Sequence, residues 1–326
     1  MPVAEVPTLT DISIYPIKSC HSIKLKECQV DALGLVNDRR FMFIDDETNR
    51  FITQRKYASM TLVRPVINAQ EKTMTLTADG QEPLTVPLNP AIAELKKRDV
   101  QLWKDRLMVY DMGDEPAEWF RTFLINHRQH DIENNHNPED AVNDSATVPN
   151  VRMVVLENPK KGIYKRPAHP RLPGTHSPFS DWSPISFGFQ SSMDEVNKGL
   201  LEHNISQGAV IPIDRFRNNL TISGTVAWEE DEWLVARIGE VTFYVIRPIA
   251  RCTVPSIDQD SGKKDGWGKA GVLDYLKLKR RFVETPTEGS FCVDVVPLTT
   301  GTIRIGDKVE VLERIPAEHV PALMEG

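Results

Sequence analysis

The chain has 326 residues, of which 40% are hydrophobic and 26% charged, a composition typical of a globular protein with room for two domains. Its formal net charge of −7 argues against broad binding to nucleic acid or an anionic membrane, so an anion site needs a local cluster of Arg and Lys. No apolar run approaches the roughly 20 residues that span a bilayer, and the N-terminus matches neither a signal peptide nor a mitochondrial presequence. We therefore expect a cytoplasmic protein, with mitochondrial association left open.

The first part of the chain predicts several strands followed by a helix. Alternating apolar residues indicate strands at 10–17, 40–44 and 73–78. Residues 115–127 carry aromatic and aliphatic side chains at helical spacing. The Asn- and Asp-rich stretch 127–150 predicts a polar loop or linker, and for its histidines we favour a solvated segment over a metal site.

The second part of the chain predicts more strands and one further helix. Ser192 to Glu195 fit a capping box, which predicts a helix that begins there. Gly306-Asp307 separates two alternating runs and predicts a hairpin turn. The predicted strands lie at 151–156, 219–223, 233–237, 241–246, 291–296 and 302–312. Many short strands with few helices favour barrel-like or sandwich-like β-domains.

Cys252 is the cysteine whose sequence context suggests chemistry. It follows the predicted strand at 241–246, precedes a loop, and is flanked by Arg247 and Arg251, whose charge would favour a thiolate. The alternative is a small buried hydrophobic residue, the usual role of a free cysteine. The four cysteines form no C-x-x-C pair, which argues against a disulfide framework and against a zinc or iron–sulfur site ligated by cysteine.

Side chains suited to binding an anion stand at the ends of several predicted strands. Lys18 and Ser19 close the first strand, the pair Arg39-Arg40 follows Asp38, and Arg217 lies in the sequence FRNNL. An arginine can hold a phosphate through two hydrogen bonds, whereas a lysine acts as a point charge. One such residue alone is usually solvated or salt-bridged, so the prediction depends on their occurring together.

Taken in this order, the motifs resemble the MOSC-domain family, and within it the amidoxime-reducing molybdoenzymes called mitochondrial amidoxime-reducing components. YPIKSC, NDRRFMFID and the tripeptide Thr53-Gln54-Arg55 are similar to the N-terminal MOSC-associated β-domain. FSDWSPISFGFQSSMDEVN, DRFRNNL and ARCTVPSIDQDSG are similar to the MOSC domain. The resemblance implies a mainly β (α+β) fold with helical insertions: an N-terminal MOSC-associated β-domain at 8–126, the polar linker at 127–150 and a MOSC β-barrel domain at 151–316.

The resemblance also implies a molybdenum–pyranopterin cofactor (Mo-molybdopterin). Cys252 takes the place of the thiolate that ligates the metal, and Asp258 that of an acidic residue that organises protons or the loop after the cysteine. Phe291 stands where the family can have a tyrosine in contact with the cofactor, and Asn218 where the motif has a proline. The expected cofactor-binding residues are Lys18, Ser19, Arg39, Arg40, Ser183, Arg217, Asn219, Arg251 and Cys252.

The function implied by the resemblance is the reduction of N-hydroxylated compounds to an amine or amidine plus water. Electrons would come from a separate partner, either a haem protein of the cytochrome b5 type with its NADH-dependent reductase or a ferredoxin, because the chain has no ferredoxin-type cysteine cluster. The basic, Pro-rich loop 160–177 is expected to shape the substrate pocket. Two alternatives stay open: a carrier of sulfur or molybdenum cofactor without substrate turnover, and an interaction module with a degenerate site.

Overall fold

The computed structural model describes residues 6–134, 148–157, 175–267 and 271–324. The strands are β1 (Thr8–Ile14), β2 (Ile23–Leu25), β3 (Glu27–Asp31), β4 (Gly34–Leu35), β5 (Phe41–Asp45), β6 (Arg64–Asn68), β7 (Thr73–Ala78), β8 (Gln81–Pro87), β9 (Lys97–Leu102), β10 (Asp105–Asp111), β11 (Val151–Val155), β12 (Ile185–Phe189), β13 (Leu220–Ser223), β14 (Trp233–Ile238), β15 (Val241–Ala250), β16 (Ser290–Pro297), β17 (Gly301–Arg304) and β18 (Val309–Arg314). The helices are α1 (Asp114–Asn126), α2 (Arg128–Asn134), α3 (Gln190–Glu202) and α4 (Val272–Lys279). This confirms the predicted mainly β fold with helical insertions.

The largest sheet has eight strands in the order β18-β14-β15-β16-β12-β13-β1-β2. Its strands β12 and β13 are parallel to each other, whereas β1 pairs antiparallel with β13, with Ile12 opposite Leu220. The first strand of the chain is therefore built into a sheet whose other members, apart from β2, follow residue 184. A smaller sheet, β17-β3-β4, joins the two ends of the chain in the same way.

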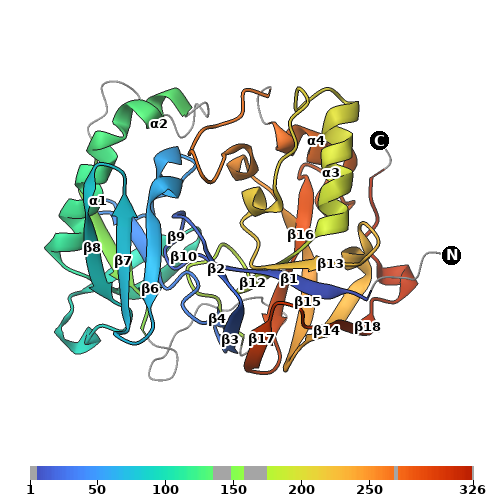
Figure 1. The fold of residues 1–326 in the computed structure, drawn as a ribbon, viewed down its shortest axis with the longest axis horizontal. Helices are drawn as coiled ribbons and strands as arrows, with labels where there is room; N and C mark the ends of the chain where they lie inside the picture. The colour runs from blue at the N-terminus through green and yellow to red at the C-terminus, as the bar shows by residue number, and fades with distance from the viewer. Residues whose placement is uncertain (1–5, 135–147, 158–174, 268–270, 325–326) are drawn as a thin grey trace.

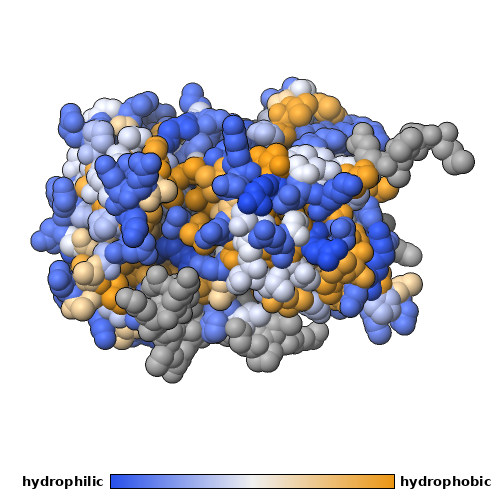
Figure 2. Space-filling view, turned by 60° about the horizontal axis from the view of Figure 1, so that its bottom comes forward, coloured by the Kyte–Doolittle hydropathy of each residue, from blue (hydrophilic) through white to orange (hydrophobic). Residues whose placement is uncertain are grey.

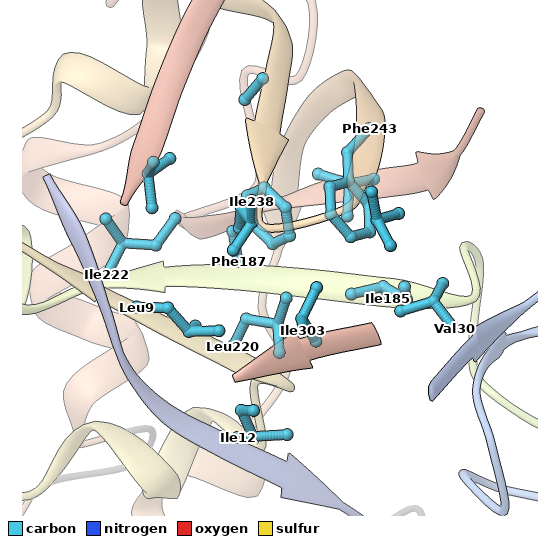
Figure 3. Close-up of a cluster of buried hydrophobic side chains, with 14 of the residues drawn as sticks. Leu9, Ile12, Val30, Ile185, Phe187, Leu220, Ile222, Ile238, Phe243 and Ile303 are labelled. Atoms are coloured by element: carbon cyan, nitrogen blue, oxygen red, sulfur yellow. The ribbon is translucent and has the colours of Figure 1, made fainter. Parts of the chain in front are cut away.

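One hydrophobic core lies on these two sheets and takes residues from both ends of the chain. Leu9 and Ile12 of β1 are fully buried, as are Phe187 of β12 and Ile303 of β17. Figure 3 shows these side chains gathered around β12 and β17. Burial of a large aliphatic or aromatic side chain contributes about 1.5–3 kcal/mol, so strands separated by nearly 300 positions are held together by their apolar faces.

We call the sheets β5-β11-β10-β9 and β6-β7-β8, together with α1 and α2, the N-terminal half, and the remaining sheets with α3 and α4 the C-terminal half. In Figure 1 the N-terminal half is on the left and α3 and α4 are on the right. Helix α1 is fixed by aromatic packing, because the rings of Phe43 and Phe120 stack with their centroids 3.6 Å apart. Strand β11 is the predicted strand at 151–156, yet it pairs with β5 and β10 of the N-terminal half.

The stretch predicted as a polar loop from residue 127 begins instead with α2. The physical reason is Asp131, which is fully buried and accepts hydrogen bonds of 2.8 Å from both the backbone N–H and the hydroxyl of Ser59. These bonds fix the helix to the N-terminal half. Residues 135–147, which include His136, lie outside the described residues.

Two local predictions in the C-terminal half are wrong. Gly306, with φ of 95°, does turn the chain, but β17 pairs with β3 and β18 pairs with β14, so no hairpin forms there. Helix α3 begins at Gln190 rather than at a Ser192 cap, because the buried Ser192 hydroxyl donates to Glu230 at 2.9 Å. In both places the sequence pattern is satisfied by a distant partner instead of a local one.

Among the described residues, no helix is long and apolar enough to cross a membrane. The face in Figure 2 is a mosaic in which hydrophilic residues surround smaller hydrophobic groups.

Candidate functional site

A cavity of about 250 Å³ lies between the N-terminal and C-terminal halves. It brings together most of the predicted site residues: Lys18, Ser19, Arg39, Ser183, Arg217, Asn219, Arg251 and Cys252 all line it. With Arg55, the lining contains five cationic side chains against two carboxylates, those of Asp181 and Asp294. The cavity is therefore locally positive in a chain whose formal net charge is −7, as a site for an anion requires.

Four of the residues that line the cavity have a left-handed backbone conformation. The φ angles are 70° at Ser19, 48° at Arg39, 56° at Trp103 and 53° at Arg217. This region costs a residue with a Cβ atom roughly 1–2 kcal/mol, so it persists only where the surrounding structure imposes it. At Arg39 the backbone N–H donates to the carbonyl of Tyr15 at 2.8 Å, and at Arg217 to that of Asp214 at 2.8 Å. Such strain concentrates at functional sites.

The guanidinium groups of Arg39 and Arg217 both lie over one buried ring, that of Tyr15. Their Cζ atoms are 4.5 Å and 4.2 Å from its centroid. The fully buried Asp38 accepts hydrogen bonds from the Tyr15 backbone N–H at 2.7 Å and from Arg39 Nη1 at 2.6 Å. Arg39 Nη2 in turn donates to the carbonyl of Arg217 at 3.0 Å. These contacts fix both arginines relative to each other.

Arg217 is a desolvated cation held by neutral groups. It donates to Gln259 Oε1 at 2.7 Å and to the carbonyl of Cys20 at 2.8 Å, and among the described residues no carboxylate forms a salt bridge with it. Burial lowers the pKa of Arg217 to about 10, a shift that the charge of Arg39 supports and that Tyr15 opposes. The side chain is still charged at neutral pH, and an anion in the cavity would supply the counter-charge that it lacks.

Lys18 reaches the cavity beyond the end of β1. Its ammonium group donates to the carbonyl of Phe179 at 2.9 Å and forms an ion pair with Asp181. Burial alone would raise the pKa of Asp181, but Lys18 and a 3.1 Å hydrogen bond from Trp103 Nε1 hold it below its ordinary range. An anion at Lys18 must therefore compete with Asp181.

Ser183 and Asn219 line the cavity while bonded to protein groups. The Ser183 hydroxyl donates to Asp294 Oδ1 at 2.6 Å. The Asn219 side chain accepts from Arg39 Nη1 at 3.2 Å and donates to the carbonyl of Ser13 at 3.1 Å. Asn219 therefore links Arg39 to β1.

Cys252 is exposed, whereas Cys20, Cys28 and Cys292 are buried. The thiol lines the cavity just after β15. The loss of surrounding water raises the pKa of Cys252, and the N–H of Val254 and the charges of Arg55 and Arg251 only partly oppose this shift. The cations therefore favour the thiolate, as expected from the sequence, but in the free thiol desolvation outweighs them.

The two arginines that flank Cys252 in sequence occupy different surroundings. The Cζ atom of Arg247 lies 5.1 Å from the centroid of the exposed Trp182 ring. Arg251 donates Nε to the carbonyl of Phe291 at 2.7 Å and Nη1 to that of Phe216 at 3.1 Å. Its buried Nη2 has no hydrogen-bond partner in the described part of the chain, so this cavity residue keeps an unused hydrogen-bond donor.

Two predicted site residues, Arg40 and Asp258, do not line the cavity. Arg40 pairs with Asp31 at 3.0 Å, because the left-handed turn at Arg39 directs the two neighbouring side chains to different places. Asp258 accepts a 2.8 Å hydrogen bond from the backbone N–H of Ser261 and pairs with Arg215 at 3.1 Å. Of the two roles considered for Asp258, the structure gives it the contacts of a residue that organises the loop.

The other two positions singled out in the sequence also face protein. Phe291 is 1% exposed and its ring centroid lies 4.1 Å from that of Phe216, so it packs in the core. Asn218 is buried and donates its amide to Thr221 Oγ1 at 2.9 Å. Of the predicted pocket loop 160–177, residues 160–174 lie outside the described residues.

Sequence reasoning assigned no role to several residues that shape the cavity. Arg55 lies over the ring of Trp103 at 4.7 Å, and both line the cavity beside Trp182. Tyr15 and Asp38 support it from behind. Their positions in the sequence were the available signal, because Tyr15 lies close to Lys18 in YPIKSC and Asp38 directly precedes Arg39 in NDRRF.

Comparisons with known proteins match two segments of the chain that line this cavity. The description "MOSC N-terminal beta barrel domain" matches residues 6–127, and "MOSC domain" matches residues 175–310. The chain is a two-domain MOSC protein. Both matched segments line the cavity, with Lys18 and Arg39 in the first and Arg217 and Cys252 in the second.

Two kinds of relative resemble this MOSC protein about equally. The chain is 26% identical over 318 residues to mitochondrial amidoxime reducing component 2 of Rattus norvegicus, covering 94% of this chain and 83% of that protein. It is 26% identical over 264 residues to the molybdenum cofactor sulfurase of Homo sapiens, covering 79% of this chain but only 27% of that protein. The chain therefore belongs with proteins related to the molybdenum cofactor.

Proposed function

We propose that this MOSC protein is a molybdenum-dependent reductase of N-hydroxylated compounds. The observation that carries the proposal is the exposed Cys252 thiol, which lines the same cavity as five cationic side chains. A soft sulfur ligand beside an anion site suits a metal bound to a phosphorylated organic ligand. No cluster of three or more metal-ligating side chains occurs among the described residues. A metal at Cys252 would therefore need to bring most of its ligands with it, as a metal–pterin does.

Different cavity residues would bind different parts of a molybdenum–pyranopterin. Arg39 and Arg217, with Lys18, would bind the phosphate through charge-assisted hydrogen bonds. The unpartnered Nη2 of Arg251 would find an acceptor on the cofactor near the metal. Cys252 would ligate the metal, whose positive charge lowers the pKa of a bound thiol and so offsets the desolvation that keeps the free thiol protonated.

When bound, this cofactor supplies two-electron chemistry that removes the oxygen from an N–OH group and, with two electrons and two protons, yields N–H and water. The chain binds, orients and encloses the reactants. The two cavity carboxyl groups differ, because Lys18 holds the pKa of Asp181 low whereas burial raises the pKa of Asp294. Asp294 is therefore the cavity carboxyl more suited to holding a proton.

The electrons would come from a separate redox protein, either a cytochrome b5 type with its NADH-dependent reductase or a ferredoxin. The similarity to an amidoxime reducing component over 94% of this chain supports a reaction that needs an external electron donor. A second candidate function is a carrier of sulfur or molybdenum cofactor without turnover, which the similarity to molybdenum cofactor sulfurases favours.

Metal analysis combined with a donor-independent assay separates these functions. The protein is purified from a host that makes the cofactor, its molybdenum and pterin are measured, and reduction of a simple amidoxime is followed with reduced viologen as donor. Molybdenum with turnover supports the reductase. Molybdenum without turnover favours the carrier, and absence of molybdenum from protein made in that host contradicts both.

A further inference from the structure

Tyr15 supports the cation cluster without lining the cavity. Its side chain is 2% exposed, and its hydroxyl lies 3.3 Å from the carbonyl of Asn218. The ring is instead in contact with two guanidinium groups, those of Arg39 and Arg217. An aromatic face carries partial negative charge and attracts a cation, most strongly where water is excluded.

Both guanidinium groups lie within 4.5 Å of the centroid of one ring, and the charge of Arg39 helps to lower the pKa of Arg217, so the two cations repel each other unless another group compensates them. Asp38 pairs with Arg39 at 2.6 Å, but among the described residues Arg217 has only neutral hydrogen-bond acceptors. The Tyr15 ring contacts both guanidinium groups and presents negative electrostatic potential to each of them.

The two arginines still have donors to offer. Hydrogen bonds to described residues use three of the five N–H groups of Arg39 and two of the five of Arg217. Because both side chains are already fixed, a bound phosphate would not have to order them, which lowers the entropic cost of binding.

We propose that Tyr15 is a positioning residue, whose ring holds the guanidinium groups of Arg39 and Arg217 together as a preformed phosphate-binding pair. The proposal rests on the proposed cofactor site, since the phosphate would be that of the pterin. It assigns the ring an electrostatic role in addition to its packing, and this distinction can be tested without metal, pterin or turnover.

The test measures the affinity of the full-length, cofactor-free protein for inorganic phosphate. The probe is the set of Arg Nε–H signals in ¹⁵N NMR spectra, followed during titration. Phenylalanine carrying zero to three ring fluorines is incorporated at position 15, because each fluorine weakens the electrostatic attraction of the ring for cations while nearly preserving its shape. We expect Tyr15→Phe to bind within about twofold of the natural protein, and the trifluoro form to bind about tenfold more weakly.

A phosphate affinity that stays the same across the fluorinated series would overturn the proposal, because packing alone would then explain the role of the ring. Tyr15→Leu is a coarser test with an expected loss of about tenfold or more, and the fluorinated series decides the matter if that variant does not fold. Arg217→Ala is the control that should weaken phosphate binding in every background. If the natural protein itself binds no phosphate, the anion site of the proposed function fails and this proposal fails with it. If phosphate binds but its affinity does not depend on the fluorination of the ring, the role of Tyr15 is refuted and the anion site of the proposed function stands.

Discussion

The two walls of the cavity are prepared for a ligand in different ways. On one wall Arg39 and Arg217 are fixed by Tyr15, Asp38 and backbone carbonyls in a strained, left-handed conformation. On the other wall the Cys252 thiol is exposed and Arg251 keeps a buried N–H without a partner among the described residues. The groups of the first wall hold one another in place, whereas the second wall would be completed by the proposed cofactor. Anion affinity and sulfur chemistry should therefore respond to different substitutions.

The largest effect is expected from Cys252→Ser, which replaces a soft sulfur ligand with a hard hydroxyl that stays protonated near neutral pH. Loss of an outer partner of a metal ligand typically costs 10–100-fold, so loss of the ligand itself should lower viologen-driven amidoxime reduction by at least about 1,000-fold. Phosphate affinity should be unchanged, because the first wall is intact. The matched control is Cys28→Ser, which is buried outside the cavity. Near-normal turnover by Cys252→Ser would refute the metal-ligand assignment.

Arg217→Ala should act on the first wall, lowering cofactor affinity by about 100-fold through the loss of a charge-assisted phosphate contact. It should also lower the free energy of unfolding by about 1–3 kcal/mol, because Gln259 and the carbonyl of Cys20 lose their donor. Molybdenum and pterin content and urea unfolding measure the two effects. Arg217→Lys should restore cofactor content in part, since the bidentate geometry is lost. Arg40→Ala, outside the cavity, is the control that should leave cofactor content unchanged.

Glu230 is a buried acid that does not line the cavity, so its titration should change the free energy of unfolding and leave ligand binding unchanged. Burial raises the pKa of Glu230 to about 7 from its ordinary 4.5, and the carboxyl accepts a hydrogen bond from Ser192. Because the folded state binds the proton more tightly, Glu230 makes the free energy of unfolding fall as pH rises from about 4.5 to about 7, with no further change above that.

Glu230→Gln should remove this dependence. Relative to the natural protein, the free energy of unfolding of the variant should rise by about 3 kcal/mol between pH 4.5 and pH 8, measured by urea unfolding. Its affinity for phosphate should not change, because Glu230 does not line the cavity. A parallel pH dependence in both proteins would show that Glu230 is not protonated in the folded state.

The smallest effect concerns the second wall. The charge of Arg55 lowers the pKa of Cys252, so Arg55→Ala should raise that pKa further. Alkylation of the cofactor-free protein by iodoacetamide at pH 8 should then slow about two- to threefold at Cys252. Arg64→Ala is the control, because its guanidinium pairs with Asp260 away from the cavity lining. Equal alkylation rates in Arg55→Ala and the natural protein would contradict the pKa shift.

Each strand that periodicity predicted is present, because alternation reports a buried face directly, but the sequence analysis did not predict β2–β4, β6, β8–β10 or β12. It could not predict which strands pair, as the Gly306-Asp307 turn shows: the turn forms, but its two flanking strands join different sheets. The Ser192 cap was misread for the same reason, since the signal was local and the partner, Glu230, is 38 positions away in sequence. Pairing depends on tertiary contacts that a single sequence does not display.

The candidate site was predictable only as far as the motif resemblance extended. Lys18, Arg39, Arg217 and Cys252 do line one cavity. The sequence could not distinguish Arg39 from its neighbour Arg40, because the side of the chain to which each points depends on the left-handed backbone at Arg39. Nor could it give the direction of the pKa shift of Cys252, where nearby arginines favour the thiolate but desolvation outweighs them.

Strand β1 of the first matched segment lies in the sheet of the second, and this has a consequence for modularity. A chain that began at residue 148 would keep β12 to β18 but lose β1, and so would expose the edge of β13 and one side of the apolar cluster drawn in Figure 3. Unpaired, hydrophobic edges of this kind promote aggregation. Although the two MOSC segments are separate in sequence, we therefore expect that the chain cannot be divided between them into two stable parts. An evolutionary rearrangement that detached one segment would have to supply a substitute for β1 as well.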